Sequence, residues 1–198
     1  IYTFAKEVEI DDVKELLDQM IACNTAIAQE GMHGDYGANI GKVIAIRKDL
    51  PSLLKAYAAA GSDARMNGCE LPVVINSGSG NQGLTVSVPL IVYAEREHLD
   101  KEKLYRALVI SNLTAIHLKT EIGRLSAFCG AVSAGAACGA GLAYLKDASE
   151  EVMNHTIVNA LAITSGIICD GAKASCAAKI AVSVEAGILG YDMYMNGQ

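Results

Sequence analysis

The sequence has 198 residues, of which 52% are hydrophobic and 19% charged, and its formal net charge is −6. A disordered chain would be richer in charge and poorer in apolar residues, so this composition indicates a folded domain. It argues against nucleic-acid binding, because no cluster of Lys and Arg is present to neutralise phosphates. The chain contains 19 Gly, two Phe and no Trp, which predicts a core of small and aliphatic side chains with closely packed backbones.

Cysteines and uncharged segments bear on the cellular compartment. The first residues lack the basic and apolar regions of a secretory signal, so we expect the six cysteines to be thiols or metal ligands in a reducing cytoplasm. Residues 125–145 and 152–169 carry no charge and are long enough to raise the question of membrane spanning. The first segment is mostly Ala, Gly, Ser and Cys, and the second contains Asn154 and His155. We therefore predict buried helices of a soluble protein, with no membrane partner.

The N-terminal part of the chain predicts helices separated by a turn. Apolar residues recur at helical spacing over residues 11–29, with an aspartate to cap the N-terminus. Residues 31–37 contain three glycines and predict a turn. A second helix is expected over about residues 38–59, which Pro51 can divide, and residues 61–63 should end it.

Residues 71–92 are ambiguous, because β-branched residues on both sides of the glycine-rich stretch 76–83 would by themselves predict a strand, a loop and a strand. Helical patterns follow at about 100–116, 129–145, from 149 onwards and at 173–189. In residues 129–145 small side chains recur four apart, a spacing that lets two helix axes approach closely. We therefore predict an all-α fold. Residues 1–198 should form a single, multi-helix, bundle-like domain with Ala/Gly-rich buried helices and at most a minor β element near residues 71–92.

Three cysteines could share a metal site. Cys169 and Cys176 are seven residues apart, and a bend at Gly171 between them would let both thiols converge on one metal. Cys129 begins the Ala/Gly-rich segment, where the positive end of a helix favours a thiolate. In the alternative interpretation, all six cysteines are small buried apolar residues, and no CxxC pair or zinc-finger spacing occurs.

The stretch 76–83, Asn-Ser-Gly-Ser-Gly-Asn-Gln-Gly, could bind an anion. Its glycines permit positive φ and leave backbone N–H groups free to surround a negative group, and a helix starting near Gln82 would add its dipole. The glycines match GxGxxG, but no acid-ended strand follows at the distance that a dinucleotide site requires. An ordinary connecting loop is the alternative. Separately, Lys119 lies in an apolar run and could be a buried base, a counter-ion or a helix-end cap.

Two segments resemble a known family. They are Gly-Cys-Glu-Leu-Pro-Val-Val-Ile-Asn-Ser-Gly-Ser-Gly-Asn-Gln-Gly at residues 68–83 and Ile-Cys-Asp-Gly-Ala-Lys-Ala-Ser-Cys at residues 168–176. Together they resemble the serine dehydratase alpha-chain-like family, which contains L-cysteine desulfidase, and the similarity covers most of the chain. Members of that family are longer by a whole N-terminal half. We therefore expect this sequence to be part of a larger catalytic domain whose N-terminal half is absent here.

The resemblance implies an all-helical catalytic domain that binds a [4Fe-4S] cluster through cysteines, without pyridoxal phosphate. Iron–sulfur serine dehydratases have a Lys-Thr, a Gly-Cys and a Cys-Asp-Pro followed by a further Cys. Residues 119–120, 129–130 and 169–170 fall in the same order here, although Gly171 replaces the proline and the last interval is shorter. The implied cluster ligands are Cys129, Cys169 and Cys176.

The implied reaction is the α,β-elimination and deamination of L-cysteine, giving sulfide, ammonia and pyruvate, or of L-serine. An iron without a protein ligand would act as a Lewis acid, and Lys119 would take the Cα proton. The implied substrate-binding residues are Asn76, Ser77, Gly78, Ser79, Gly80 and Asn81. The alternative is a non-catalytic helical domain with a degenerate site, acting in assembly or small-molecule binding.

Helices rich in Ala and Gly bury their backbones against neighbours, so a partial chain should leave apolar surface uncovered. We therefore expect these residues to form a homo-oligomer or to pack against the missing N-terminal half. Alone, they should be inactive and unable to hold an intact cluster.

Overall fold

The computed structural model describes residues 1–123 and 126–198. Within these residues it contains nine α-helices and no β-strand, only two isolated bridges. The helices are α1 (Tyr2–Glu7), α2 (Ile10–His33), α3 (Ile40–Ala45), α4 (Leu50–Met66), α5 (Gly80–Arg96), α6 (Lys101–Ile122), α7 (Gly130–Leu145), α8 (Glu150–Thr164) and α9 (Cys176–Met195). The predicted all-α fold is confirmed.

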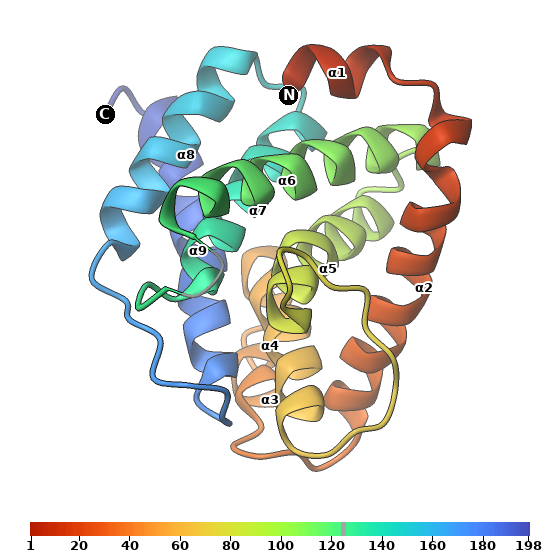
Figure 1. Cartoon of the computed structure of the whole chain (residues 1–198), viewed down its shortest axis with the longest axis vertical. Coiled ribbons are helices and arrows are strands. Elements are labelled where there is room, and N and C mark those ends of the chain that lie inside the picture. Colours follow the sequence, from red (N-terminus) through yellow and green to blue (C-terminus); the bar gives the residue numbers. More distant parts are fainter. Residues whose placement is uncertain (124–125) are drawn as a thin grey trace.

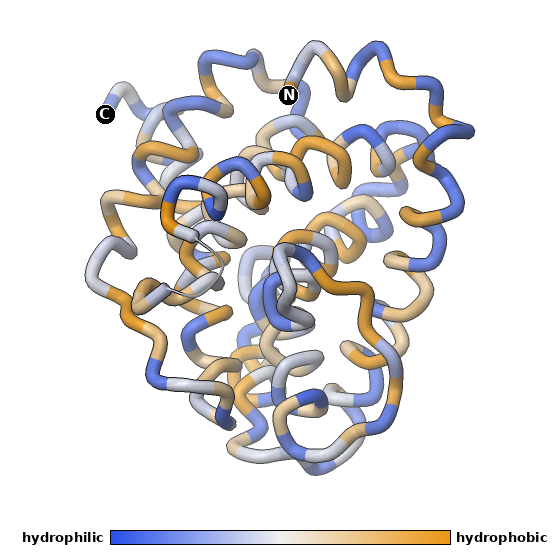
Figure 2. The backbone as a smooth tube through the Cα atoms, in the orientation of Figure 1, coloured by the Kyte–Doolittle hydropathy of each residue, from blue (hydrophilic) through white to orange (hydrophobic). Residues whose placement is uncertain are grey.

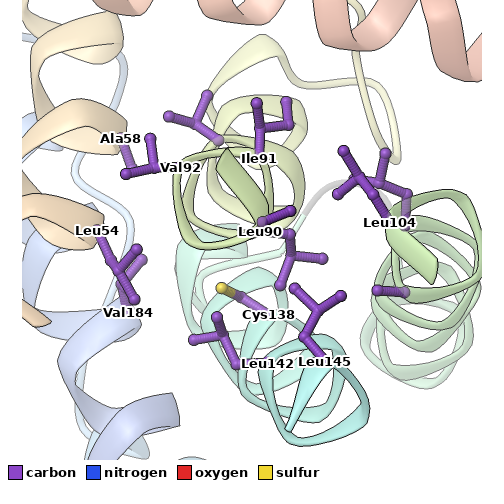
Figure 3. Packing of buried hydrophobic residues seen from close by; sticks show 14 of the residues in the cluster. Leu54, Ala58, Leu90, Ile91, Val92, Leu104, Cys138, Leu142, Leu145 and Val184 are labelled. Carbon is purple, nitrogen blue, oxygen red and sulfur yellow. The ribbon is translucent and has the colours of Figure 1, made fainter. Parts of the chain in front are cut away.

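Helices α5 and α7 lie among the other helices and carry most of the core. Helix α7 packs against α5, α6, α8 and α9, and α5 packs against α2, α4 and α6 (Figure 1). Figure 2 shows apolar positions concentrated on these inner helices, whereas hydrophilic positions recur along α1 and α2 at the edge of the molecule. The central apolar cluster includes Leu90, Leu104, Leu142 and Leu145, with the thiol of Cys138 fully buried among them (Figure 3).

Several helices begin where a short polar side chain accepts a hydrogen bond from the backbone N–H three residues later. This interaction satisfies one of the N–H groups that the first turn of a helix leaves unpaired. The capping residues are Asp49, Ser79, Asp100 and Ser149. The starts of α4, α5, α6 and α8 are therefore set by local signals that are visible in the sequence, whereas α7 and α9 have no side-chain cap.

The ambiguity over residues 71–92 is resolved in favour of a helix, and the expectation of at most a minor β element is confirmed, because only an isolated bridge joins Asn76 and Ser79 there. Residues 80–96 form α5, and residues 67–79 approach it without regular secondary structure. Every residue of α5 from Leu84 to Val92 is buried. This part of the helix, including its β-branched residues, therefore packs against neighbours on all sides. Tertiary burial outweighs their strand preference, and even Pro89 is accommodated within the helix.

The helix expected over residues 38–59 is two helices, α3 and α4. Pro51 lies in the first turn of α4, where a backbone N–H is not needed. The expected stop at residues 61–63 is wrong, because α4 continues to Met66. Residues 61–63 are buried inside α4, and a Cβ on Gly61 would lie 3.1 Å from the nearest methyl carbon of Leu84. The glycine thus serves close packing between α4 and α5 rather than helix termination.

Helices α7 and α9 are in backbone contact. A Cβ on Gly187 of α9 would lie 2.6 Å from the carbonyl oxygen of Gly135, and one on Gly139 would lie 2.8 Å from the Cα of Gly187. The four-residue spacing of small side chains predicts this close approach. Leu125, at the start of the uncharged segment that ends in α7, lies outside the described residues. Among the described residues, no helix combines the length and the apolar character needed to cross a membrane.

Candidate functional site

The glycine-rich stretch begins with a tight turn over residues 76–79. The N–H of Asn76 donates to the carbonyl oxygen of Ser79 (3.1 Å), and the N–H of Ser79 donates back to that of Asn76 (3.0 Å). Ser77 and Gly78 have φ of 49° and 81°, as in a type I′ turn. Ser77 therefore adopts a left-handed conformation that is uncommon outside glycine and that is found preferentially at functional sites.

The side chain of Asn76 holds this turn in place. Its Nδ2 donates to the side-chain oxygen (2.9 Å) and the carbonyl oxygen (3.2 Å) of Asn112 on α6. Its Oδ1 accepts a hydrogen bond from the Ser77 hydroxyl (2.9 Å). Both ends of the Asn76 amide are thus engaged with the protein, as are the backbone N–H groups of Asn76 and Ser79, which leaves the N–H groups of Ser77 and Gly78 as the donors of the turn that can meet a ligand.

The turn leads directly into the N-terminus of α5, where Arg65 is close by. The Arg65 guanidinium donates to Oδ1 of Asn81 (3.3 Å), and a Cβ on Gly80 would lie 2.3 Å from Nε of Arg65. An arginine beside free N–H groups at a helix N-terminus forms a surface suited to a carboxylate or phosphate. The sequence pattern did not point to Arg65, because it lies on α4, outside the glycine-rich stretch.

Lys119 and the turn line the same cavity. Lys119 on α6 is only 5% exposed, and the salt bridges among the described residues leave it without an acidic partner. A cavity of about 410 Å³ is lined by Lys119 together with Ser77, Thr120 and Gly123. The structure therefore places Lys119 and Ser77 at one cavity, although the two are far apart in the sequence.

Cys129 and Cys169 are held together by backbone pairing. Phe128 and Ile168 form an antiparallel bridge, in which Cys129 N–H donates to Ile167 (3.2 Å) and Cys169 N–H donates to Ala127 (2.7 Å). Side chains alternate between the two faces of such a pair, so both thiols, which flank the bridge diagonally, project from the same face. Cys129 also stands at the N-cap of α7.

Cys176 lies at the start of α9, next to the same segment. Lys179, one turn further along α9, donates to the carbonyl oxygen of Ile168 (3.2 Å) and pairs with Asp170. Lys179 and Lys173 hold the pKa of Asp170 at about 2, so this carboxylate stays ionised and ties residues 168–170 to α9. Burial raises the pKa of the Cys129 thiol, and its neighbours Cys169 and Cys176 add to this effect, whereas the N–H of Ala131 and the charge of Lys179 oppose it.

The described residues contain no group of three or more His, Cys, Asp or Glu that could hold a single metal ion. Cys129, Cys169 and Cys176 are therefore not arranged as a zinc-like site. A four-iron cluster makes a different demand, because each thiolate binds a different iron and the ligands stand farther apart than around one ion. Cys129, Cys169 and Cys176 have the thiol chemistry that such a cluster binds, and would supply three of the four ligands that it usually has.

The N-terminal turns of α5 and α7 meet at the side chain of Gln82. This residue, in the first turn of α5, is buried, and a Cβ on Gly130 would lie 2.5 Å from its Nε2. Gly130 directly follows Cys129, so the N-terminal turns of α5 and α7 are in contact. Cys129 itself lines a second, mostly apolar cavity of about 220 Å³ that includes Ile122, the neighbour of Gly123 in the first cavity. The structure thus brings the turn, Lys119 and Cys129 into one region.

The cysteines of the iron-free protein should differ strongly in reactivity. Cys169 is exposed, whereas Cys138 is fully buried and its pKa is raised by that burial. We expect iodoacetamide to alkylate Cys169 in the native protein and to leave Cys138 unmodified until the protein unfolds, because the reactive thiolate must be both formed and accessible. Peptide mass spectrometry after timed quenching measures this, and alkylation of Cys138 at a rate similar to Cys169 in the native state would contradict it.

Comparison with known proteins identifies the family. Residues 2–198 match the family model described as the serine dehydratase alpha chain. The chain belongs to this family. The resemblance carried by residues 68–83 and 168–176 is therefore confirmed. No solved structure matches the chain.

Relatives in the serine dehydratase alpha-chain family are similar along the whole chain. A UPF0597 protein from Desulfitobacterium hafniense is 62% identical over 200 residues, which cover 100% of this chain and 46% of that protein. UPF0597 proteins from Finegoldia magna and Treponema denticola are 53% and 48% identical, again over 100% of this chain and over 48% and 47% of their own lengths. The chain thus spans about half the length of the curated relatives it matches.

Proposed function

We propose that the protein is an iron–sulfur-dependent lyase that eliminates and deaminates L-cysteine, giving sulfide, ammonia and pyruvate, or L-serine, giving ammonia and pyruvate. Membership of the serine dehydratase alpha-chain family supports a lyase. The observation that carries the proposal is that Lys119 and Ser77 line one cavity, while Cys129, which the backbone pairs with the segment of Cys169, lines a neighbouring one. We place the protein in a reducing cytoplasm, where cysteines such as the six free ones here persist as thiols.

Cys129, Cys169 and Cys176 would hold a [4Fe-4S] cluster. When bound, the cluster supplies a Lewis acid to the leaving group of the substrate. Two of the thiols project from one face of a backbone pair, and Lys179 and Asp170 hold the segment that carries Cys169 against α9. A further ligand, or the walls of the site, would come from the part of the protein that lies outside these residues.

The turn and the N-terminus of α5 would bind the substrate carboxylate. Backbone N–H groups near the start of a helix point at a bound anion, and the helix dipole favours its charge. Asn76 holds the turn, and Ser77 lines the same cavity as Lys119. The proposed substrate-binding residues are Asn76, Ser77, Gly78, Ser79, Gly80 and Asn81.

Lys119 would be the base that removes the Cα proton. As the Cα–H bond breaks, its electron pair forms the Cα–Cβ double bond and the Cβ–S or Cβ–O bond breaks. The product, aminoacrylate, tautomerises to an imine, which water hydrolyses to pyruvate and ammonia. The position of Lys119 suits this role, because it is buried beside the turn and a catalytic base must lie within reach of the proton that it removes.

The direct test is an assay of the complete gene product, reconstituted with iron and sulfide under anaerobic conditions. The proposal expects sulfide and pyruvate in equal amounts from L-cysteine, or ammonia and pyruvate from L-serine. Absence of elimination with both amino acids, in protein that holds no iron, would instead favour a non-catalytic helical domain acting in assembly or small-molecule binding.

Lys119→Met should lower kcat by about 10²–10⁴-fold, the usual contribution of a positioned base, without changing the iron content. Lys103→Met is the matched control, because Lys103 is also partly buried but pairs with Asp147 at the opposite end of α6 from Lys119. Steady-state kinetics with iron analysis on both variants measure the effect. Wild-type kcat in Lys119→Met would assign proton removal to another group.

We also propose that more of the same polypeptide, or a second copy, covers part of the surface. Val43 and Ile46, in and just after α3, and Val182 on α9 are at least half exposed, and some of them line one apolar groove. Such patches usually mark partner surfaces. The 198 residues alone should therefore be inactive, and stable cluster loading with elimination by this piece would contradict the proposal.

A further inference from the structure

Residues 73–79 have no regular secondary structure, yet a buried asparagine on α2 binds their backbone. Asn24 on α2 is fully buried. The N–H of Val74 donates to Oδ1 of Asn24 (2.9 Å), and Nδ2 of Asn24 donates to the carbonyl oxygen of Val74 (3.3 Å). One amide side chain thus satisfies both backbone groups of Val74, as a neighbouring β-strand would.

Asn24 also connects this segment to α5. Its Nδ2 donates to the hydroxyl of Ser87 (2.9 Å), which in turn donates to the carbonyl oxygen of Gly83 (2.7 Å). A Cβ on Gly83 would lie only 2.0 Å from the carbonyl oxygen of Val74. The segment therefore lies directly on the first turn of α5, and Asn24 bonds to Val74 directly and to Gly83 through Ser87.

Asn112 on α6 is a second anchor, at the start of the 76–79 turn. It accepts both hydrogen bonds from Nδ2 of Asn76, through its side-chain oxygen (2.9 Å) and its carbonyl oxygen (3.2 Å). Its own Nδ2 donates to the carbonyl oxygen of Leu108 (2.9 Å), which fixes the orientation of the amide. The turn is thus held from α2 on one side and from α6 on the other.

We propose that Asn24 and Asn112 are positioning residues, which hold the 76–79 turn in the shape that binds the substrate carboxylate. Their effect on kinetics rests on the proposed function, whereas the anchoring itself can be measured without it. A turn that binds the substrate equally in the ground state and the transition state contributes to KM rather than to kcat. Loss of an anchor should therefore weaken substrate binding and leave the chemical step intact.

The experiment compares Asn24→Leu and Asn112→Leu with Asn159→Leu in the complete gene product. Asn159 is the matched control, because its amide also bonds between helices, to Gly190 (3.1 Å), but away from the turn. In both test variants the amides of Asn76 and Ser79 should exchange hydrogen about tenfold faster, because their bonds open more often. KM for the amino acid should rise about tenfold with kcat within about twofold, and Asn159→Leu should change neither.

Aspartate variants keep the proposal testable if the leucine variants do not fold. Asn112→Asp retains the side-chain oxygen that accepts the hydrogen bond from Asn76, so the amides of Asn76 and Ser79 should still exchange slowly. Asn24→Asp loses the hydrogen bond to the Val74 carbonyl oxygen, so the same amides should exchange faster. Unchanged exchange at Asn76 and Ser79 in the Asn24 variants would overturn the inference. Faster exchange in a protein whose wild type performs no elimination would support the anchoring and overturn the proposed lyase instead.

Discussion

Anaerobically reconstituted Cys169→Ser protein should lose most of its iron and the broad visible absorption of an iron–sulfur protein. Cys169 is exposed and projects from the same face of the backbone pair as Cys129, so its thiol is available to a cluster and contributes little to the core. A serine in its place keeps the backbone bond to Ala127 and removes only the sulfur ligand. The loss of iron should therefore occur without a loss of helical circular dichroism.

Cys23→Ser is the control for this prediction. Cys23 is a partly buried thiol on α2, outside the region where the turn and α7 meet, so its replacement should leave iron and acid-labile sulfide at wild-type levels. Both proteins are loaded side by side and analysed for iron per chain. Full iron content in Cys169→Ser would remove this residue from the ligand set and with it the geometric basis of the proposed cluster.

Gly187→Val should lower the free energy of unfolding by about 3 kcal/mol or more, because overpacking of a well-packed site is costly and backbone atoms cannot move aside as side chains do. The new Cβ would lie 2.6 Å from the carbonyl oxygen of Gly135 and 3.0 Å from the Cα of Gly139. Helices α7 and α9 would have to separate, which also moves Cys129 at the N-cap of α7.

Urea unfolding followed by circular dichroism measures this effect. Gly166→Ala is the control, since a Cβ there meets nothing within 4 Å, and its free energy of unfolding should stay within about 0.5 kcal/mol of wild type. If Gly187→Val does not fold at all, Gly187→Ala gives the milder measurement. A wild-type unfolding midpoint in both Gly187 variants would show that α7 and α9 are not in backbone contact.

Much of the helical architecture could be predicted from local sequence. Asp100 and Ser149 cap helices whose apolar residues follow at helical spacing, and these signals act over a few residues. The small side chains four apart on α7 likewise predicted a close helix crossing, because a residue without a large side chain allows the backbone of a neighbouring helix to approach. The motifs at residues 68–83 and 168–176 indicated the family without any knowledge of the fold.

Other features were decided only by the tertiary structure, because they depend on contacts between residues far apart in the chain. Residues 84–92 became helix because neighbouring helices bury every side of α5, and burial outweighed the strand preference of its β-branched residues. No local pattern marks Asn24 as the partner of Val74, or Arg65 as a neighbour of Gly80, because nothing in the sequence of α2 or α4 records which loop will pack against it. The sequence by itself thus determined helices, caps and family, whereas three-dimensional packing determined which polar side chains surround the candidate site.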